Sequence, residues 1–461
     1  MPKVRPREPM PKRPPEERVK DFKEVALGYS ERQAVKEASR CLMCPTKPCV
    51  KGCPVKIDIP KFIKFIRERR FEEAYKVIKE KCPIPAITGR VCPQEVQCEK
   101  TCTLAKLGQP IAIGALERFV ADWARENGVE DRVPPRHGNK EGKIAVVGSG
   151  PAGIVVAADL VKLGYDVTVF EALHIPGGVL VYGIPEYRLP KEIVLREIDY
   201  LEELGVNIEL GIVVGKTVSL DEILETYDAV FLGTGAGHPR FLNIPGENYS
   251  YIYTANEFLT RINLMRAFLF PEYDTPLHKG KHVAVIGGGN TAMDAARSAL
   301  RLGAKEVTII YRRTRKEMPA RAEEIENAEE EGIRFLFLAQ PVEFLSNNGS
   351  SVSGIRLMKM KLGPPDKSGR PCPLPTNKTF ILDNIDMVIN AIGFYPNPLI
   401  PRSNQKLKTD KKGRVIVDNH GRTSIRGVYA GGDIVIGEGT VIEAMGWGRK
   451  ASEAIHVDLT C

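Results

Sequence analysis

The sequence predicts an α/β protein in which a small helical domain precedes two Rossmann-like dinucleotide-binding domains. A strand–turn–helix–strand unit beginning at Lys143 recurs at His282, and each copy has a glycine-rich turn after its first strand. This repetition is typical of a duplicated dinucleotide-binding fold. Seven of the ten cysteines fall in two clusters within residues 41–102, where apolar residues recur with the period of a helix.

Length and composition suit an ordinary globular protein. The 461 residues are 43% hydrophobic and 27% charged, and we expect divisions at 1–142, 143–245, 246–393 and 394–461. No run of about 18 apolar residues is present, so no membrane span is expected, and with no signal peptide the expected location is cytoplasmic. The net charge of +8 comes with no nucleic-acid-binding motif. The basic, proline-rich tail Met1–Lys20 is interpreted as a solvated arm or a strap against a partner.

Helical signals organise the first 140 residues. Ser30 and Gln33 have the spacing of a capping box, which predicts the start of a helix leading to Cys41. Pro60–Lys81 has helical periodicity, and Asp131–Gly142 has the composition of a linker.

The two cysteine clusters have the spacing of iron–sulfur ligands. The first is Cys41-x2-Cys44-x4-Cys49-x3-Cys53-Pro54, and the second is Cys92-Pro93-x4-Cys98-x3-Cys102. Close spacing with a proline after the last cysteine is typical of a loop around a four-iron cluster, and the cysteine before proline often ligates a second cluster. Disulfides are disfavoured by the cytosolic character of the sequence. Structural zinc is disfavoured because only one CxxC pair is present and no histidine lies near.

Two four-iron clusters need eight ligands, and the clustered cysteines provide seven. The candidates for the eighth are Cys82, between the two groups, and Glu117, in a helical stretch. The local sequence favours Cys82. Cys372 and Cys461 are isolated and are expected to be unliganded.

The first glycine-rich turn has the pattern Gly148-x-Gly150-x-x-Gly153. Gly148 allows the tight turn, Gly150 lets the backbone approach a pyrophosphate, and Gly153 packs the helix on the strand. Glu171 ends the second strand, where a carboxylate accepts hydrogen bonds from ribose hydroxyls and repels a 2′-phosphate. This site therefore predicts FAD or NAD.

The second turn predicts a different nucleotide. Its pattern is Gly287-x-Gly289-x-x-Ala292, and the position equivalent to Glu171 is Tyr311, followed by Arg312 and Arg313. Guanidinium groups bind phosphate through a planar fork of donors, so the second site favours NADPH over NADH.

Three later segments are buried strands that end in glycine. Residues 228–236 and 386–393 are expected to be the crossings between the nucleotide domains. Residues 427–433 end in Gly432 and Asp433, and this aspartate can accept hydrogen bonds from a flavin ribitol while the glycines allow close approach.

These motifs, with Gly89–Glu95, Gly177–Pro190 and Gly287–Asp294, resemble the glutamate synthase small-subunit family over about residues 18–460. That family includes the large subunit of NADH-dependent reduced ferredoxin:NADP oxidoreductase, also called sulfide dehydrogenase. The N-terminal part of dihydropyrimidine dehydrogenase is also similar. At Cys82 and Thr88 the sequence departs from the family pattern, which has Asn and Cys there, and no functional consequence is expected.

The resemblance implies two [4Fe-4S] clusters, FAD and NADP(H), and it places Glu117 rather than Cys82 among the ligands. One cluster is expected on Cys41, Cys44, Cys49 and Cys102, and the other on Cys53, Cys92, Cys98 and Glu117. The expected FAD contacts are Gly148, Gly150, Gly153, Glu171, Val179, Arg188, Val214, Gly432, Asp433, Thr440 and Val441. The expected NADPH contacts are Gly288, Gly289, Asn290, Thr291, Arg312, Arg313, Ala391, Ile392 and Gly393.

The function implied is an oxidoreductase subunit that exchanges hydride between NADPH and FAD and passes single electrons through its clusters to or from a partner. No protein side chain is expected to act as a nucleophile or base. The sequence is nearest to the ferredoxin:NADP oxidoreductase type, whose flavin can split electron pairs. The alternative is the glutamate synthase subunit that supplies electrons to the amidotransferase subunit. A non-enzymatic scaffold that delivers clusters is disfavoured by two complete nucleotide sites. The partner is expected to carry a flavin or an iron–sulfur centre, as ferredoxin does, and to dock on residues 1–140.

Overall fold

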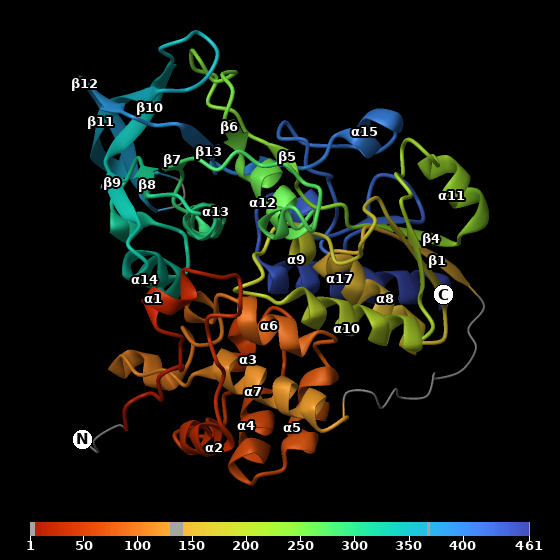
Figure 1. The fold of residues 1–461 in the computed structure, drawn as a ribbon. Helices are drawn as coiled ribbons and strands as arrows, with labels where there is room; N and C mark the ends of the chain where they lie inside the picture. The colour runs from red at the N-terminus through yellow and green to blue at the C-terminus, as the bar shows by residue number, and fades with distance from the viewer. Residues whose placement is uncertain (1–4, 130–141, 367–368, 461) are drawn as a thin grey trace.

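The computed structural model describes residues 5–129, 142–366 and 369–460. The predicted linker Asp131–Gly142 therefore lies, except for Gly142, outside the described residues. A helical region forms one end of the molecule, and two parallel sheets lie above it in Figure 1. The predicted order, helical first and then twice α/β, is present in the structure.

The region before residue 129 is helical. Its α-helices are α1 (Pro15–Arg18), α2 (Glu31–Ala38), α3 (Pro48–Gly52), α4 (Ile59–Arg67), α5 (Phe71–Lys79), α6 (Pro85–Val91) and α7 (Ile113–Glu126), with short 3-10 turns η1 (Gln94–Val96) and η2 (Thr103–Leu107).

The predicted capping box begins α2, with the Gln33 backbone N–H donating to the Ser30 hydroxyl and the Ser30 N–H donating to the Gln33 side chain. The helical periodicity over Pro60–Lys81 is confirmed: the segment forms two helices, α4 and α5, and the chain turns between them at Arg69, whose φ is +59°. The uninterrupted apolar pattern concealed this turn because both helices bury one face in the same core.

The first sheet has the strand order β15-β4-β1-β2-β3, with all its pairings parallel. Its strands are β1 (Lys143–Val147), β2 (Asp166–Glu171), β3 (Asn207–Leu210), β4 (Ala229–Leu232) and β15 (Val428–Ala430). The helices of this part are α8 (Pro151–Lys162), α9 (Val179–Tyr182), α10 (Lys191–Glu203), α11 (Leu220–Thr226), α15 (Leu399–Ser403), α16 (Asp433–Ile436) and α17 (Val441–Thr460).

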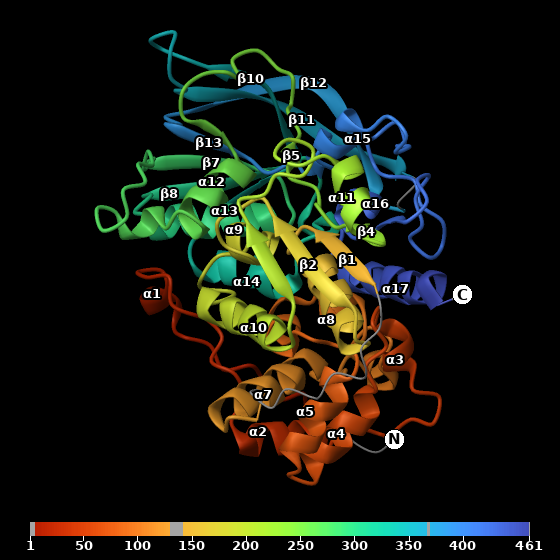
Figure 2. The same cartoon turned by 90° about the vertical axis from the view of Figure 1, so that its right-hand side faces the viewer.

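Helices α8 and α17 pack closely between this sheet and the helical region (Figure 2). A Cβ added at Gly448 would come within 2.5 Å of the Ala152 carbonyl oxygen, so glycine is what permits this approach.

The second sheet has the order β6-β13-β7-β8-β9 and is also parallel. Its strands are β6 (Ile252–Thr254), β7 (His282–Ile286), β8 (Glu306–Tyr311), β9 (Arg334–Phe337) and β13 (Met387–Asn390). With it lie α12 (Ala255–Asn263), α13 (Asn290–Arg301), α14 (Ala322–Glu330), η3 (Ala267–Leu269) and η4 (Arg315–Glu317). A three-stranded antiparallel sheet of β10 (Ala339–Leu345), β11 (Gly354–Pro365) and β12 (Pro371–Asp383) lies against it.

The chain crosses between the two parallel sheets twice. The outward crossing contains β5 (His238–Pro239), the return contains β14 (Phe394–Tyr395), and the two short strands pair with each other. The first sheet is therefore completed by β15 only after the second has been inserted.

The described part of the N-terminal tail is bound to its own chain, so its interpretation as a solvated arm is wrong, whereas contact of the tail with a partner stays a prediction. From residue 5 it runs along the helical region and then reaches α14 of the second sheet (Figure 1). Arg7 pairs with Glu99 at 2.6 Å, and Arg18, only 1% exposed, pairs with Glu331 at 2.8 Å. Arg18 also donates to the backbone and side-chain oxygens of Asn327.

Glu331 is the centre of a buried charge cluster. Besides Arg18 it accepts hydrogen bonds from Arg297 and Arg301. Burial alone would raise the pKa of the Glu331 carboxyl, but the Arg297 and Arg301 guanidinium groups keep it well below its usual range. The Tyr187 ring lies under Arg297 and Arg301, with the guanidinium carbons 4.7 and 4.1 Å from its centroid. The cluster thus joins the tail, the second sheet and the segment before α10.

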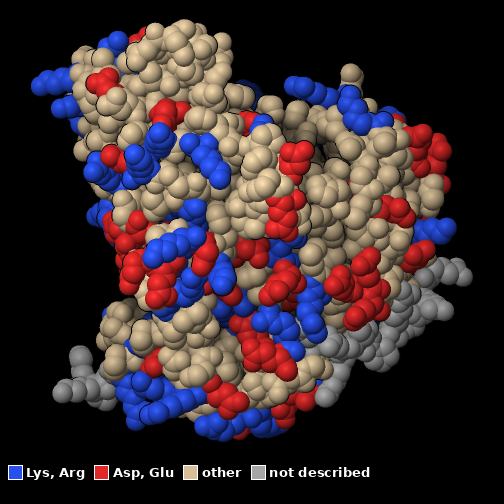
Figure 3. All heavy atoms as spheres, viewed as in Figure 1, with Lys and Arg blue, Asp and Glu red and all other residues tan. Residues whose placement is uncertain are grey.

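Lysine and arginine are interspersed with aspartate and glutamate over the face in Figure 3, without a continuous basic stripe. Among the described residues, no helix is long and apolar enough to span a bilayer.

Candidate cofactor sites

The first glycine-rich loop joins β1 to α8 and has the geometry of a phosphate site. Gly148 has a φ of +101°, and a Cβ there would come within 2.7 Å of the Gly233 oxygen. A Cβ on Gly153 would come within 2.0 Å of the Gly148 oxygen. No atom lies within 4 Å of the Cβ position at Gly150, so this glycine opens onto free space at the N-terminus of α8. Free backbone N–H groups and the helix dipole favour an anion at that position.

Glu171 lies beside this loop at the end of β2. Its carboxylate accepts hydrogen bonds from the backbone N–H and hydroxyl of Ser149 and from the N–H of Leu173. The acid is therefore fixed next to the loop, where the sequence predicts ribose binding.

The other residues expected at the flavin come from several elements. Val179 begins α9, Val214 is buried, and Thr440 and Val441 stand at the start of α17. Asp433 begins α16 after Gly432, and burial raises the pKa of the Asp433 carboxyl to about 7. A carboxyl largely removed from water is a suitable acceptor for ligand hydroxyls.

Arg188 has a protein partner. Its Nη1 lies 2.6 Å from Asp294 Oδ2 on α13, and its Nε lies 3.5 Å from Glu324. Burial lowers the pKa of the Arg188 guanidinium, but the carboxylates of Asp294 and Glu324 raise it more, so the pKa lies above its usual value. The pair connects the segment after α9 to the second nucleotide helix.

The second glycine-rich loop joins β7 to α13. Gly287 has a φ of +143°, and a Cβ there would come within 2.2 Å of the Ala391 oxygen, which brings the predicted Ala391–Gly393 segment to this loop. Gly288 lies against the Tyr311 ring, and Gly289 faces open space before α13. The Asn290 and Thr291 side chains are carried by the first turn of that helix.

Arg312 and Arg313 end in different environments. Arg313 is buried and donates to Asp366 and to the Pro371 carbonyl, both at 2.8 Å, and so is bound to the hairpin β11–β12. Arg312 is exposed. Although the residue is exposed, partial desolvation of its guanidinium and the neighbouring cations Arg313 and Arg370 lower the Arg312 pKa. From the sequence, both arginines were expected to bind phosphate. In the structure Arg312 is exposed, whereas Arg313 is bound to the hairpin.

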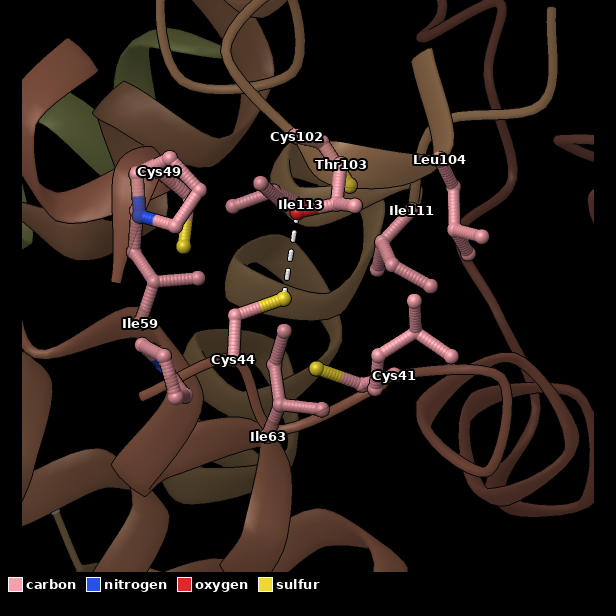
Figure 4. A pocket seen from close by; sticks show the side chains of 13 residues that line it. Cys41, Cys44, Cys49, Ile59, Ile63, Cys102, Thr103, Leu104, Ile111 and Ile113 are labelled. Atoms are coloured by element: carbon pink, nitrogen blue, oxygen red, sulfur yellow. Dashed lines mark hydrogen bonds between the residues drawn. The ribbon is translucent and has the colours of Figure 1, made fainter. Parts of the chain in front are cut away.

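Four cysteines surround one pocket in the helical region, and we call them the outer set: Cys41, Cys44, Cys49 and Cys102. Figure 4 shows the side chains around a common space, with Cys44 Sγ 3.1 Å from the Thr103 hydroxyl. All four are partly exposed. Apolar residues, including Ile59, Ile63 and Ile113, complete the lining.

The inner set consists of Cys53, Cys92, Cys98 and Glu117, which are at most 8% exposed. Burial raises the pKa of each group, that of Glu117 to about 7, and the proximity of the four raises the thiol pKa values further. Such a set is unstable as free anions, and a cationic cluster that binds thiolate and carboxylate would stabilise it. Cys82 is also fully buried beside them.

The donor chemistry therefore fits the predicted clusters. All nine described cysteines are free thiols, so none of them takes part in a disulfide. Among the described residues no group of His, Cys, Asp or Glu is placed to hold a single metal ion, as structural zinc would require.

Two contacts near the sites were missed from the sequence. The Gln97 side chain donates to the Thr440 hydroxyl at 3.1 Å, which connects the inner cysteine region to α17. Arg321 donates its backbone N–H to Asn290 and its guanidinium to the Arg90 carbonyl, so it joins the second nucleotide loop to the helical region. Gln97 is an unspecified position of the second cysteine cluster and Arg321 belongs to no local motif, so only the tertiary structure could reveal these two contacts.

Comparison with known proteins agrees with this architecture. A family model described as dihydropyrimidine dehydrogenase domain II, 4Fe-4S cluster, matches residues 18–129, and one described as pyridine nucleotide-disulphide oxidoreductase matches residues 129–456. The NADPH complex of FprA from Mycobacterium tuberculosis has the same fold over 70% of this chain and 85% of its own, with a TM-score of 0.58 and 24% identity. Fold and sites together define an NADPH-dependent flavin and iron–sulfur oxidoreductase.

Two similar proteins show to which family of these oxidoreductases the chain belongs. The small chain of NADPH-dependent glutamate synthase from Azospirillum brasilense is 37% identical over 96% of this chain and 93% of its own. The beta subunit of NADP(+)-dependent formate dehydrogenase from Moorella thermoacetica is 40% identical over 89% of this chain, which spans only 59% of that subunit. The chain belongs to the family of the glutamate synthase small chain. It binds FAD, NADP(H) and 4Fe-4S clusters, and both relatives are subunits of larger enzymes.

Proposed function

We propose that this chain transfers reducing equivalents between NADPH and a partner subunit by way of FAD and two four-iron clusters. When bound, FAD exchanges a hydride with NADPH and single electrons with the clusters. The observation that carries the proposal is the order of the sites. The buried inner set is connected to the FAD-side helix α17 through Gln97 and Thr440, whereas the outer set is partly exposed.

The proposed ligands follow the two sets. The inner cluster takes Cys53, Cys92, Cys98 and Glu117, and the outer cluster takes Cys41, Cys44, Cys49 and Cys102. Pro54, after Cys53, packs against Gly446 of α17, where a Cβ would come within 3.2 Å of it. The inner set therefore lies on the α17 side of the helical region. We also propose the division 1–142, 143–245, 246–393 and 394–461, because the first sheet takes strands from both sides of the second.

For NADPH we propose that Arg312 contacts the 2′-phosphate and that Arg313 supports it by anchoring the hairpin. Losing a charge-assisted hydrogen bond of about 1.5–3 kcal/mol weakens binding roughly 10- to 100-fold. Arg312→Ala should therefore weaken NADPH binding by that factor and leave NADH binding and FAD content unchanged. Arg313→Ala should affect both nucleotides, since it releases the hairpin. Coincident NADPH titrations of wild type and Arg312→Ala would refute the assignment.

The partner is proposed to dock where the outer set reaches the surface. Leu42 and Leu107, which flank Cys41 and Cys102 in the sequence, are 58% and 56% exposed. Lys106, beside Leu107, and Lys51, in α3 after Cys49, are also exposed. Such a surface suits a partner with an apolar patch ringed by carboxylates, carrying its own flavin or iron–sulfur centre, as ferredoxin does.

Experiment can distinguish two proposals for the enzyme of which this chain is a subunit. The first is the ferredoxin:NADP oxidoreductase type, with or without electron bifurcation. The second, supported by the near-complete match to the glutamate synthase small chain, is the electron-supplying subunit of that enzyme. Copurification of the native partner separates them, because only the second partner forms glutamate from glutamine and 2-oxoglutarate.

The decisive test is anaerobic purification with iron, labile sulfide and flavin analysis. We expect about eight irons and one FAD per chain, NADPH-driven reduction of artificial dyes, and no glutamate formation by the isolated chain. Zinc in place of iron, or fewer than about four irons, would contradict the cluster assignment. A native chain that is monomeric at physiological concentration would contradict the partner.

A further inference from the structure

A short hydrogen-bonded chain ends at Glu117. Cys82 Sγ lies 3.2 Å from Thr88 Oγ1, and Thr88 Oγ1 donates to Glu117 Oε1 at 2.5 Å. The three side chains are buried and come from separate places, Cys82 after α5, Thr88 in α6 and Glu117 in α7. The two positions at which the sequence departs from the family pattern therefore contact each other, and the expectation of no consequence needs revision.

The Thr88 hydroxyl has one proton to donate, and a carboxylate is a stronger acceptor than the Ile84 carbonyl, which lies 3.3 Å from the same hydroxyl. Thr88 is therefore placed to donate to Glu117. The contact with Cys82 Sγ, in which either atom can be the donor, directs the Cys82 side chain toward the Thr88 hydroxyl.

We propose that Thr88 is a positioning residue that presents Glu117 to the inner cluster and holds Cys82 out of the ligand set. The inference rests on the proposed function, since it concerns the same cluster. With Oε1 engaged by Thr88, Oε2 is the oxygen left to ligate iron. The local sequence favours Cys82 over Glu117, whereas this hydrogen-bonded chain favours Glu117.

The Thr88 hydrogen bond should also influence the reduction potential. A donor to a cluster ligand withdraws negative charge and so stabilises the reduced state. Its removal should shift the midpoint of the inner cluster to a more negative value and leave the outer cluster unchanged.

The test compares anaerobically purified Thr88→Val, Thr88→Ser and Cys82→Ala chains by redox titration and electron paramagnetic resonance, with FAD content as the check on folding. Thr88→Val should lower the inner midpoint and alter its signal, and Thr88→Ser, which keeps the hydroxyl, should restore both. Cys82→Ala leaves the hydroxyl in place and should retain about eight irons and the wild-type signal.

A Thr88→Val chain with FAD bound and wild-type potentials would overturn the inference. So would a Cys82→Ala chain that loses as much iron as Cys92→Ser. Glu117→Ala distinguishes this failure from failure of the cluster assignment. If Glu117→Ala changes nothing, Glu117 is not a ligand. If it alters the inner cluster while Thr88→Val does not, only the role of Thr88 is wrong.

Discussion

Replacing Arg18 by methionine should loosen the N-terminal tail from the second sheet. Methionine keeps much of the apolar stem but none of the hydrogen bonds to Glu331 and Asn327. The charge-assisted bond to Glu331 is worth about 1.5–3 kcal/mol and the bonds to Asn327 about 1 kcal/mol each, partly offset by no longer burying a guanidinium. Glu331 keeps Arg297 and Arg301, so it is not left as an unpaired charge. We expect a net loss of about 2–3 kcal/mol.

Urea unfolding followed by circular dichroism and flavin fluorescence measures this loss as a shift in the transition midpoint. Arg315→Ala is a matched control. Arg315 pairs with Glu329 of α14, the helix that also contains Asn327, but its guanidinium is half exposed. Such a surface pair contributes about 0–1 kcal/mol. If Arg18→Met shifts the midpoint no more than Arg315→Ala does, the buried role of Arg18 is wrong.

By the same argument, deleting residues 1–20 should reduce stability and NADPH-driven dye reduction, so it cannot test partner docking alone.

Three other expectations can be tested on the same protein. Glu331→Gln should flatten the acid dependence of stability: the native Glu331 pKa is depressed, so its contribution is fully present above the unfolded value of about 4.3, begins to fall below it and is lost completely only below the native pKa, and the urea midpoints of the two proteins should therefore differ most near pH 6 and draw steadily closer as the pH is lowered below about 4. Arg188→Met should cost about 3–5 kcal/mol because it leaves Asp294 buried and unpaired, and adding Asp294→Asn should recover part of it in thermal unfolding; an additive double variant would contradict coupling. Gly153→Ala should abolish FAD retention, since its Cβ would lie 2.0 Å from backbone oxygen, whereas Gly237→Ala, with its nearest contact at 3.9 Å, should retain FAD.

The sequence predicted well whatever is local. The βαβ units could be predicted because each strand, glycine turn and helix is contiguous, and β1 begins at Lys143 and β2 ends at Glu171 as expected. The two runs of cysteines also follow from short spacing. The outer and inner sets each take members of both runs, and only the family resemblance implied them; in the structure they differ in burial.

What could not be predicted depends on distant partners. Arg18 appeared to be one basic residue of a polar tail, because its carboxylate partner lies 313 residues further on. Arg313 seemed equivalent to Arg312 until the hairpin supplied Asp366. The Thr88 hydroxyl became informative only when α6 and α7 placed it against Glu117. In each case the local pattern is the same whether or not the partner is present.

The tail also has a consequence for biogenesis. Translation proceeds from the N-terminus, and α14 is made long after residues 41–117 have left the ribosome. Arg18 has no carboxylate partner until then, so docking of this end of the tail must be a late event. Arg7 and Glu99 both belong to the part that is made early, so the start of the tail can dock sooner. The cysteine pockets can therefore form before the second sheet is complete, and the late step is the attachment of Arg18 to α14 and Glu331.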